Sequence, residues 1–190
     1  MKRGKQIGEE LSGLLQQRIL LLDGAMGTMI QARGLQEADY RGKEFARHTR
    51  DLRLNNDALN LSQPTIIEEI HGLYLDAGAD IIETNTFNCN AISMGEYGLE
   101  SRVADLNMAG AQVARRAVER HAAKKGRRCF VAGSMGPTSK SASVSNDVAN
   151  PAARPVTFDQ LREIYGTQAK ALVAKAHQVW PHVDLRLKVV

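Results

Sequence analysis

Three short segments place acidic, amide or hydroxyl side chains directly after an apolar run, and two of the three also contain glycines. They are Asp-Gly-Ala-Met-Gly-Thr at 23–28, Glu-Thr-Asn-Thr-Phe-Asn at 83–88 and Gly-Ser-Met-Gly-Pro-Thr at 133–138. The glycines of the first segment let the backbone turn tightly and bring N–H groups close to a small anion such as a carboxylate. Asp23 could pair with an amine beside it. The alternative is that each segment is only a structural turn. None is a Walker A loop or a G-x-G-x-x-G fingerprint, so no nucleotide site is predicted.

The segments around these residues alternate between two patterns. Short continuous apolar runs occur at 19–22, 58–61, 80–82 and 129–132. Between them, helical spacing of apolar residues predicts helices at 7–15, 66–77, 94–125 and 157–174. Apolar runs without alternation, separated by helices, are typical of a parallel sheet that is covered on both faces.

Functional loops of such α/β folds lie at the carboxyl ends of the strands. The three polar segments, together with Ser62-Gln63 after the second run, should therefore share one rim. A (β/α)8 barrel takes about 250 residues, and this chain has 190. The pattern leaves an open sheet possible. We predict an α/β fold with about four parallel strands, the first half of a (β/α)8 TIM barrel and incomplete.

Composition narrows the function classes. The chain has 25 Lys and Arg against 21 Asp and Glu, a net charge of only +4. The basic cluster at 115–128 is interpreted as the solvated face and C-terminal end of a helix, because no aromatic residues interleave with it. No apolar run reaches membrane-spanning length and no secretory h-region is present. We expect a cytoplasmic protein without nucleic-acid or membrane partners.

Other candidate residues give weaker signals. Cys89 and Cys129 have neither disulfide nor zinc spacing, although Cys89 follows a predicted strand end and could be exposed. His71 lies on a predicted helix and is interpreted as partly buried structure. The segment 139–155 is rich in Ser, Asn and Pro and is predicted to be a long loop, which is often functional in a compact domain.

The motifs themselves resemble a known family. LLLDGAMGTMIQ at 20–31, the segment 55–88 ending in IIETNTFN, and VAGSMGPT at 131–138 closely resemble the homocysteine-binding module of cobalamin-dependent methionine synthase. The similarity runs from about 18 to 174. Betaine-type homocysteine methyltransferases share the Asp-Gly turn but are less similar in the other segments.

This resemblance implies a (β/α)8 barrel that binds homocysteine and zinc. Zinc would hold the substrate thiolate, which attacks the methyl group of methylcobalamin carried by another module. The implied partners are homocysteine and the cobalamin- and folate-binding modules of the full-length enzyme. By matching motif, the implied substrate-binding residues are Asp23, Gly24, Gly27, Thr28, Glu83, Asn85, Ser134 and Gly136.

The chain departs from the family in its metal ligands. The family's zinc ligands are three cysteines, one in a late strand and two in a Gly-Gly-Cys-Cys pair, and neither motif is present. We therefore predict no metal site and assign no catalytic residue, and we expect homocysteine and methionine to bind weakly and alike. The predicted organisation is a partial barrel domain at 1–174 and a divergent tail at 175–190 whose alternation at 183–190 suggests an amphipathic strand. The rival interpretation is a non-catalytic fragment or small-ligand binding protein.

Overall fold

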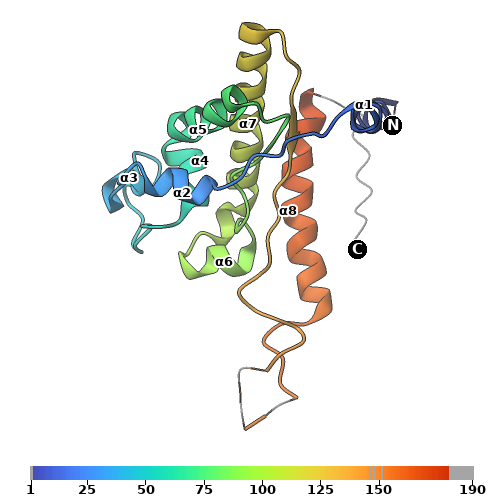
Figure 1. Ribbon diagram of the computed structural model, residues 1–190. Coiled ribbons are helices and arrows are strands. Elements are labelled where there is room, and N and C mark those ends of the chain that lie inside the picture. The colour runs from blue at the N-terminus through green and yellow to red at the C-terminus, as the bar shows by residue number, and fades with distance from the viewer. Residues whose placement is uncertain (1, 146, 148, 151, 180–190) are drawn as a thin grey trace.

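The computed structural model describes residues 2–145, 147, 149–150 and 152–179, and it is an α/β arrangement dominated by helices (Figure 1). The predicted strand at 183–190 lies outside the described residues. The elements in chain order are α1 (Lys2–Gln17), α2 (Met26–Gln31), α3 (Glu37–Arg41), η1 (Asn56–Ala58), α4 (Leu59–Ser62), α5 (Pro64–Ala77), β1 (Ile81–Glu83), α6 (Ala91–Glu96), η2 (Glu100–Arg102), α7 (Val103–Lys125), β2 (Phe130–Ala132) and α8 (Phe158–Val179).

The sheet is smaller than predicted. β1 and β2 pair in parallel, with Ile82 opposite Val131, and the predicted first strand at 19–22 contributes one parallel bridge between Leu22 and Ile81. The order across the sheet is thus Leu22, β1, β2. Four strands are not found among the described residues. The first run stays a bridge because its side chains have little to pack on: Leu21 and Leu22 are each more than half exposed.

The predicted strand at 58–61 is wrong, because these residues are helical. Asn55 caps the turn: its side chain accepts a hydrogen bond from the backbone N–H of Ala58 at 3.1 Å. Ala58 and Leu59 are fully buried in the core on the helical side of the molecule. A four-residue apolar run fits a buried helical turn as well as a buried strand, and here the N-cap decides.

The predicted helices are confirmed with shifted boundaries. α5 starts with Pro64 and ends at Ala77, followed by Gly78, whose φ of 112° is the left-handed C-cap conformation. The predicted helix at 94–125 is divided into α6, η2 and α7, and Gly98 at φ 69° lies at the break. His71 on α5 is fully buried, more than expected, and burial lowers its pKa to about 4.

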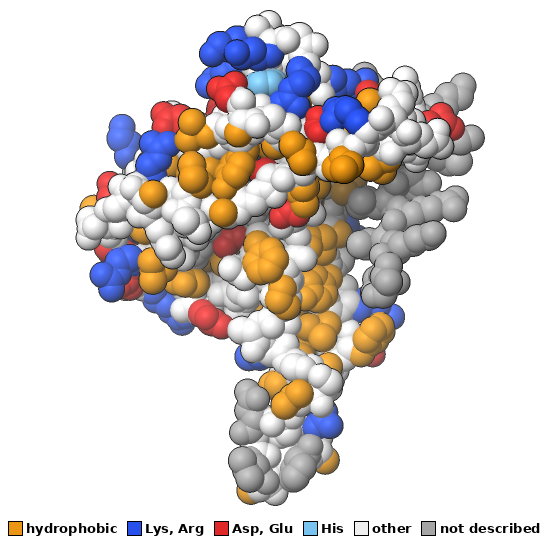
Figure 2. Space-filling view, viewed as in Figure 1, with side chains coloured by type: hydrophobic (Ala, Val, Ile, Leu, Met, Phe, Trp, Pro, Cys, Tyr) orange, Lys and Arg blue, Asp and Glu red, His pale blue; other side chains and the backbone are white. Residues whose placement is uncertain are grey.

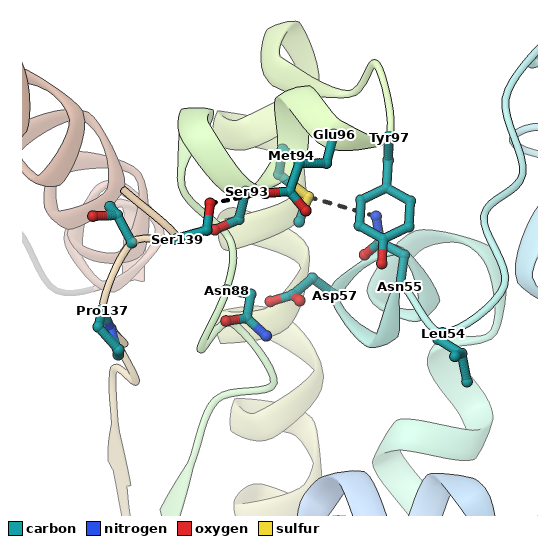
Figure 3. A pocket seen from close by; sticks show the side chains of 11 residues that line it. Leu54, Asn55, Asp57, Asn88, Ser93, Met94, Glu96, Tyr97, Pro137 and Ser139 are labelled. Atoms are coloured by element: carbon teal, nitrogen blue, oxygen red, sulfur yellow. Dashed lines mark hydrogen bonds between the residues drawn. The ribbon is translucent and has the colours of Figure 1, made fainter. Parts of the chain in front are cut away.

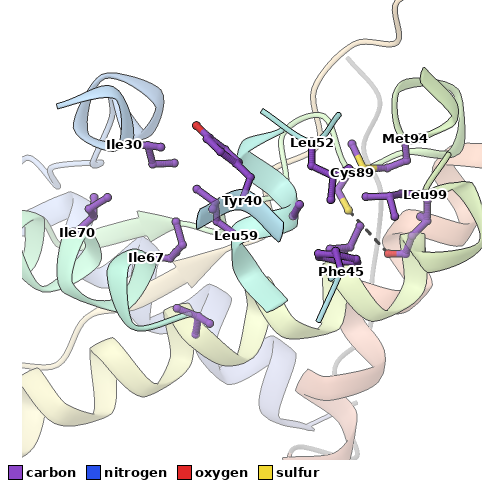
Figure 4. Packing of buried hydrophobic residues seen from close by; sticks show 14 residues of the cluster. Ile30, Tyr40, Phe45, Leu52, Leu59, Ile67, Ile70, Cys89, Met94 and Leu99 are labelled. Atoms are coloured by element: carbon purple, nitrogen blue, oxygen red, sulfur yellow. Dashed lines mark hydrogen bonds between the residues drawn. The ribbon is translucent and has the colours of Figure 1, made fainter. Parts of the chain in front are cut away.

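The helices α5, α7 and α8 lie side by side on one face of the sheet (Figure 1). The larger apolar cluster lies among α2 to α7, and Figure 4 shows its side chains converging between these helices, with Ile67 and Leu59 among the fully buried ones. A second cluster, which includes Ile82 and Leu75, packs β1 against α5 and α7.

A buried carboxylate anchors the strands at their amino-terminal side. Asp80 accepts hydrogen bonds from both terminal nitrogens of Arg18 at 2.8 and 2.7 Å, from the Leu21 N–H at 3.0 Å and from Arg127 at 3.2 Å. These donors, with Arg18 first, lower the pKa of Asp80 to about 2. One side chain therefore connects the end of α1, the start of β1 and the approach to β2.

The basic cluster at 115–128 is largely paired with acidic side chains. Arg115 bridges Glu119 within α7, Arg127 bridges Asp80, and Arg128 bridges Glu10 of α1. These pairs agree with the interpretation of the cluster as a helix face and end. Within the described part of the chain, no helix combines the length and the apolar character that crossing a bilayer requires.

The exposed apolar edge predicts self-association. Ile19, Leu21 and Leu22 are 83%, 55% and 54% exposed along a strand edge, and Figure 2 shows hydrophobic side chains gathered on this face. Such edges pair with other chains, so we expect a dimer or larger species, and Leu22→Lys should shift the population toward monomer. Sedimentation velocity over a concentration range measures this. Leu73→Lys, at a half-exposed site on α5, is the matched control, and a wild-type monomer at every concentration would contradict the prediction.

Candidate functional site

The turn after Leu22 brings Asp23 to the end of β1. The Asp23 N–H donates to the carbonyl of Ile81, and Asp23 Oδ1 accepts from the backbone N–H of Glu83 at 2.9 Å. The tight turn that follows does not use its glycines for a left-handed conformation. Ala25 takes it instead, at φ 45°, immediately before α2. A non-glycine residue in this region is strained, and such positions cluster at ligand sites.

Amide and hydroxyl side chains lock the ends of β1 and β2 together. Thr86 Oγ1 donates to the carbonyl of Ser134 at 2.8 Å, and the Ser134 N–H donates to Thr84 Oγ1 at 2.9 Å. Asn85 donates to the carbonyl of Asn56 at 2.7 Å, which connects this network to the loop before η1. The polar residues of the second segment are thus partly structural, and they hold three chain segments at fixed separations.

Gly136 lies where the backbone passes close to an aromatic ring. Its N–H donates to the carbonyl of Phe87 at 2.8 Å, and a Cβ at Gly136 would come within 2.6 Å of the Phe87 ring. Tyr165 on α8 donates from its hydroxyl to the Gly136 carbonyl at 3.1 Å. Only glycine fits at position 136, because the Phe87 ring occupies the space that a side chain would need. The hydrogen bond between the two backbones holds Phe87 in this position.

These segments enclose a cavity of about 280 Å³ at the carboxyl ends of the strands. Of the eight sequence-predicted residues, the cavity lining includes Asp23, Gly24, Gly27, Glu83, Asn85 and Ser134. Thr28 is exposed on α2 outside the lining, and Gly136 acts through Phe87, which does line it. The predicted shared rim is therefore formed by three of its four segments. Ser62 and Gln63 lie elsewhere, bonded to the carbonyls of Ala58 and Asp39.

The cavity is acidic. Its lining contains the carboxylates of Asp23, Asp57 and Glu83, and no Lys, Arg or His of the described residues lines it. Desolvation, opposed by hydrogen bonds, raises the pKa of Asp23 to about 6 and that of Asp57 to about 7. Acids whose burial is not matched by a protein cation mark a site for a cationic group of a ligand.

Sequence reasoning missed part of this lining. Asn56 and Asp57 line the cavity without having been predicted, together with Asn88 from the predicted segment 83–88. Asp57 and Asn88 also line a neighbouring cavity of about 340 Å³ (Figure 3). The signal was the run Asn-Asn-Asp at 55–57, which is typical of a helix N-terminus. A strand at 58–61 would place functional residues at its carboxyl end, whereas the residues that line the cavity lie in the loop before it and in η1.

The two cysteines do not provide a metal site. Cys89, which the sequence suggested could be exposed, is fully buried and its thiol points to the Val103 carbonyl, and burial raises its pKa. Cys129 is also buried. Across the described residues, no cluster of three His, Cys, Asp or Glu side chains could hold a metal ion. Zinc needs three or four such ligands, so the described residues do not fit it.

Fold and site together define an α/β protein with a small-molecule cavity at the carboxyl ends of parallel strands, as in barrel enzymes. The chain belongs to the homocysteine S-methyltransferase family, whose family model matches residues 20–185.

Solved structures of a relative share this fold. The metallated form of the homocysteine methyltransferase MmuM from Escherichia coli is 25% identical, with a TM-score of 0.64, and the match covers 87% of this chain and 54% of that one. The oxidised form is 26% identical with a TM-score of 0.65, over 87% and 53%. The apo form gives 25% and 0.57. This chain thus spans about half the length of the structures that it matches.

Close packing of α7 against Thr86 and Asn60 predicts that a side chain at Gly110 would destabilise the fold. A Cβ at Gly110 of α7 would lie 2.6 Å from Thr86 Cγ2 and 2.8 Å from Asn60 Nδ2. We expect Gly110→Ala to destabilise the protein by about 1–3 kcal/mol through overpacking. Gly72→Ala on α5, where a Cβ meets nothing within 4 Å, should be neutral or stabilising by up to about 1 kcal/mol. Urea unfolding of both variants measures this, and equal stability would contradict the close packing.

The lack of a zinc ligand set among the described residues predicts a low zinc content for the purified protein. Purified chain, loaded with zinc and then dialysed, should retain far less than one zinc per molecule, because the two thiols are buried apart from any partner set. Elemental analysis gives the ratio, with a zinc-free preparation as the blank. A stoichiometric, tightly held zinc would show that ligands outside the described residues complete a site.

Proposed function

We propose that this chain is the amino-acid-binding part of a homocysteine S-methyltransferase, and that its cavity binds the ammonium and carboxylate end of homocysteine. The observation that carries the proposal is the acidic cavity at the strand ends, with no protein cation among its described lining residues. An ammonium group supplies the missing positive charge. Asp23 and Glu83 would face it, since their carboxylates follow the first two strand segments on the same side.

The remaining residues of the site have supporting roles in this proposal. The backbone around Gly24, Gly27 and Thr28 would hold the substrate carboxylate, as the family resemblance implies. Ser134 donates from Oγ to Glu83 Oε2 at 3.2 Å, which orients that carboxylate toward the cavity. Asn85 fixes the separation of the loop at Asn56 and the end of β1.

The finer assignment follows the motifs. We propose the methionine synthase type, in which homocysteine takes the methyl group of methylcobalamin to give methionine, and the cobalamin- and folate-binding modules are the partners. In that family zinc binds and activates the thiol. Because the described residues do not fit zinc, we propose substrate binding for this chain and little or no methyl transfer by it alone. A cytoplasmic location belongs to the same proposal.

Asp23 provides the test. The Asp23→Asn variant keeps an oxygen to accept the Glu83 N–H but loses the charge, so affinity for homocysteine and for methionine should fall about tenfold. Wild-type affinity should also weaken as the pH falls below about 6, because protonation of Asp23 removes the ion pair with the ammonium group. Asp57 titrates in the same cavity, so the variant isolates the contribution of Asp23.

Isothermal titration of both ligands between pH 5 and 8 makes this measurement. Asp76→Asn, an acid on the exposed side of α5, is the control and should bind like the wild type. Unchanged affinity in the Asp23→Asn variant would remove Asp23 from the site. No binding of either amino acid to the wild type would overturn the proposed function.

A further inference from the structure

Phe87 is a large apolar side chain to which the proposed function gives no role. It lines the cavity of about 280 Å³ at the strand ends and is 52% exposed. Met26, the first residue of α2, is the other large apolar side chain of that lining, which is otherwise mostly polar or acidic. A half-exposed apolar side chain is common on protein surfaces, so its role depends on how firmly it is held.

The two residues that flank Phe87 are fixed by buried side chains. The Thr86 carbonyl accepts a hydrogen bond from Nε2 of Gln168 on α8 at 2.8 Å, and Gln168 is fully buried. On the other side, the Asn88 N–H donates to the buried carboxyl of Asp57, and Figure 3 shows these two residues side by side. The backbone at 86–88 is thus bonded to α8 and to η1, which holds the position of Phe87 at the cavity.

The ring of Phe87 is fixed by Gly136. Three ring atoms lie within 2.7 Å of the place that a Cβ at Gly136 would occupy, so the ring lies flush against that backbone. The Gly136 N–H donates to the Phe87 carbonyl at 2.8 Å, and the Tyr165 hydroxyl donates to the Gly136 carbonyl at 3.1 Å. An apolar surface that is held before the ligand arrives loses little conformational entropy on binding.

The cavity pairs each acid with an apolar side chain. Met26 follows Asp23 in the turn into α2, and Phe87 follows Glu83 after β1. Both segments therefore supply one carboxylate and one large apolar group to the same cavity. This arrangement fits a ligand with a cationic end and an apolar end, and no Lys, Arg or His of the described lining could receive an acidic side chain.

We infer that Phe87 and Met26 form an apolar wall for the side chain of the bound amino acid, and that Phe87 makes the site prefer sulfur-containing side chains over polar ones of the same length. The inference rests on the proposed function, in which the acids hold the ammonium group. The methylene groups and sulfur of homocysteine and methionine pack favourably on an aromatic ring. A hydroxyl in place of the sulfur loses its hydration there and gains no hydrogen bond from the wall.

The test compares homocysteine with homoserine, which has a hydroxyl in place of the thiol. Isothermal titration of the full chain under reducing conditions should show about tenfold tighter binding of homocysteine. In Phe87→Ala the ratio should fall toward one through loss of homocysteine affinity, whereas Phe87→Leu, which keeps an apolar side chain, should retain most of it. Phe158→Ala is the matched control and should keep the wild-type ratio, because Phe158 is 74% exposed on α8 and lines neither cavity.

The outcomes separate the wall from the head-group site. Homoserine affinity that is unchanged in Phe87→Ala shows that the variant folds, and Met26→Gln, similar in length but polar, should lower the ratio independently. Equal wild-type binding of homocysteine and homoserine, or a preference that both Phe87→Ala and Met26→Gln keep, overturns the apolar wall and leaves the proposed function standing. If Phe87→Ala binds neither ligand, the ratio in Met26→Gln decides in the same way. Failure of the wild type to bind homocysteine or methionine overturns both proposals.

Discussion

The carboxylate of Asp80 is the constraint on which the site geometry depends. It lies at the start of β1 and receives Arg18 and the Leu21 N–H from the first segment, and Arg127 from the approach to β2. Three segments that are distant in sequence are therefore aligned at their amino-terminal side. Because parallel strands advance in step from that point, Asp23 reaches the N–H of Glu83 at the other end. The cavity is a consequence of this alignment.

Acids at the two ends of the sheet have opposite electrostatic environments. Hydrogen bonds from Arg18 and the Leu21 N–H, with the positive charge of Arg127, stabilise the ionised form of Asp80 and lower its pKa to about 2. Asp23 and Asp57 are desolvated without a cation, and their pKa values lie near 6 and 7. The first environment stabilises the fold at neutral pH, whereas ionised acids in the second destabilise it. A cationic ligand would offset the desolvation of these carboxylates, so unpaired acids at a cavity are typical of a binding site for a positive group.

Local signals in the sequence predicted the parts of the structure that depend on local chemistry. The helix predicted at 66–77 is found as α5, two residues longer at its start, and the polar segments after 19–22, 80–82 and 129–132 meet at one cavity. A short apolar run such as 58–61 suits either element, and here the Asn55 cap and the burial of Leu59 together make it helical. The weak first strand likewise reflects missing packing partners, which no local pattern encodes.

Some contacts need only one chain segment and others need several segments together. This difference explains how a chain about half as long as its relative can hold a defined site. Under the proposed function, each strand end contributes its own contacts to the amino-acid head group, so a subset of strands retains a subset of the binding free energy. Metal coordination does not divide in this way, because zinc needs three or four ligands together and the described residues offer none of these sets. Recognition of the amino acid and activation of its thiol are therefore physically separable.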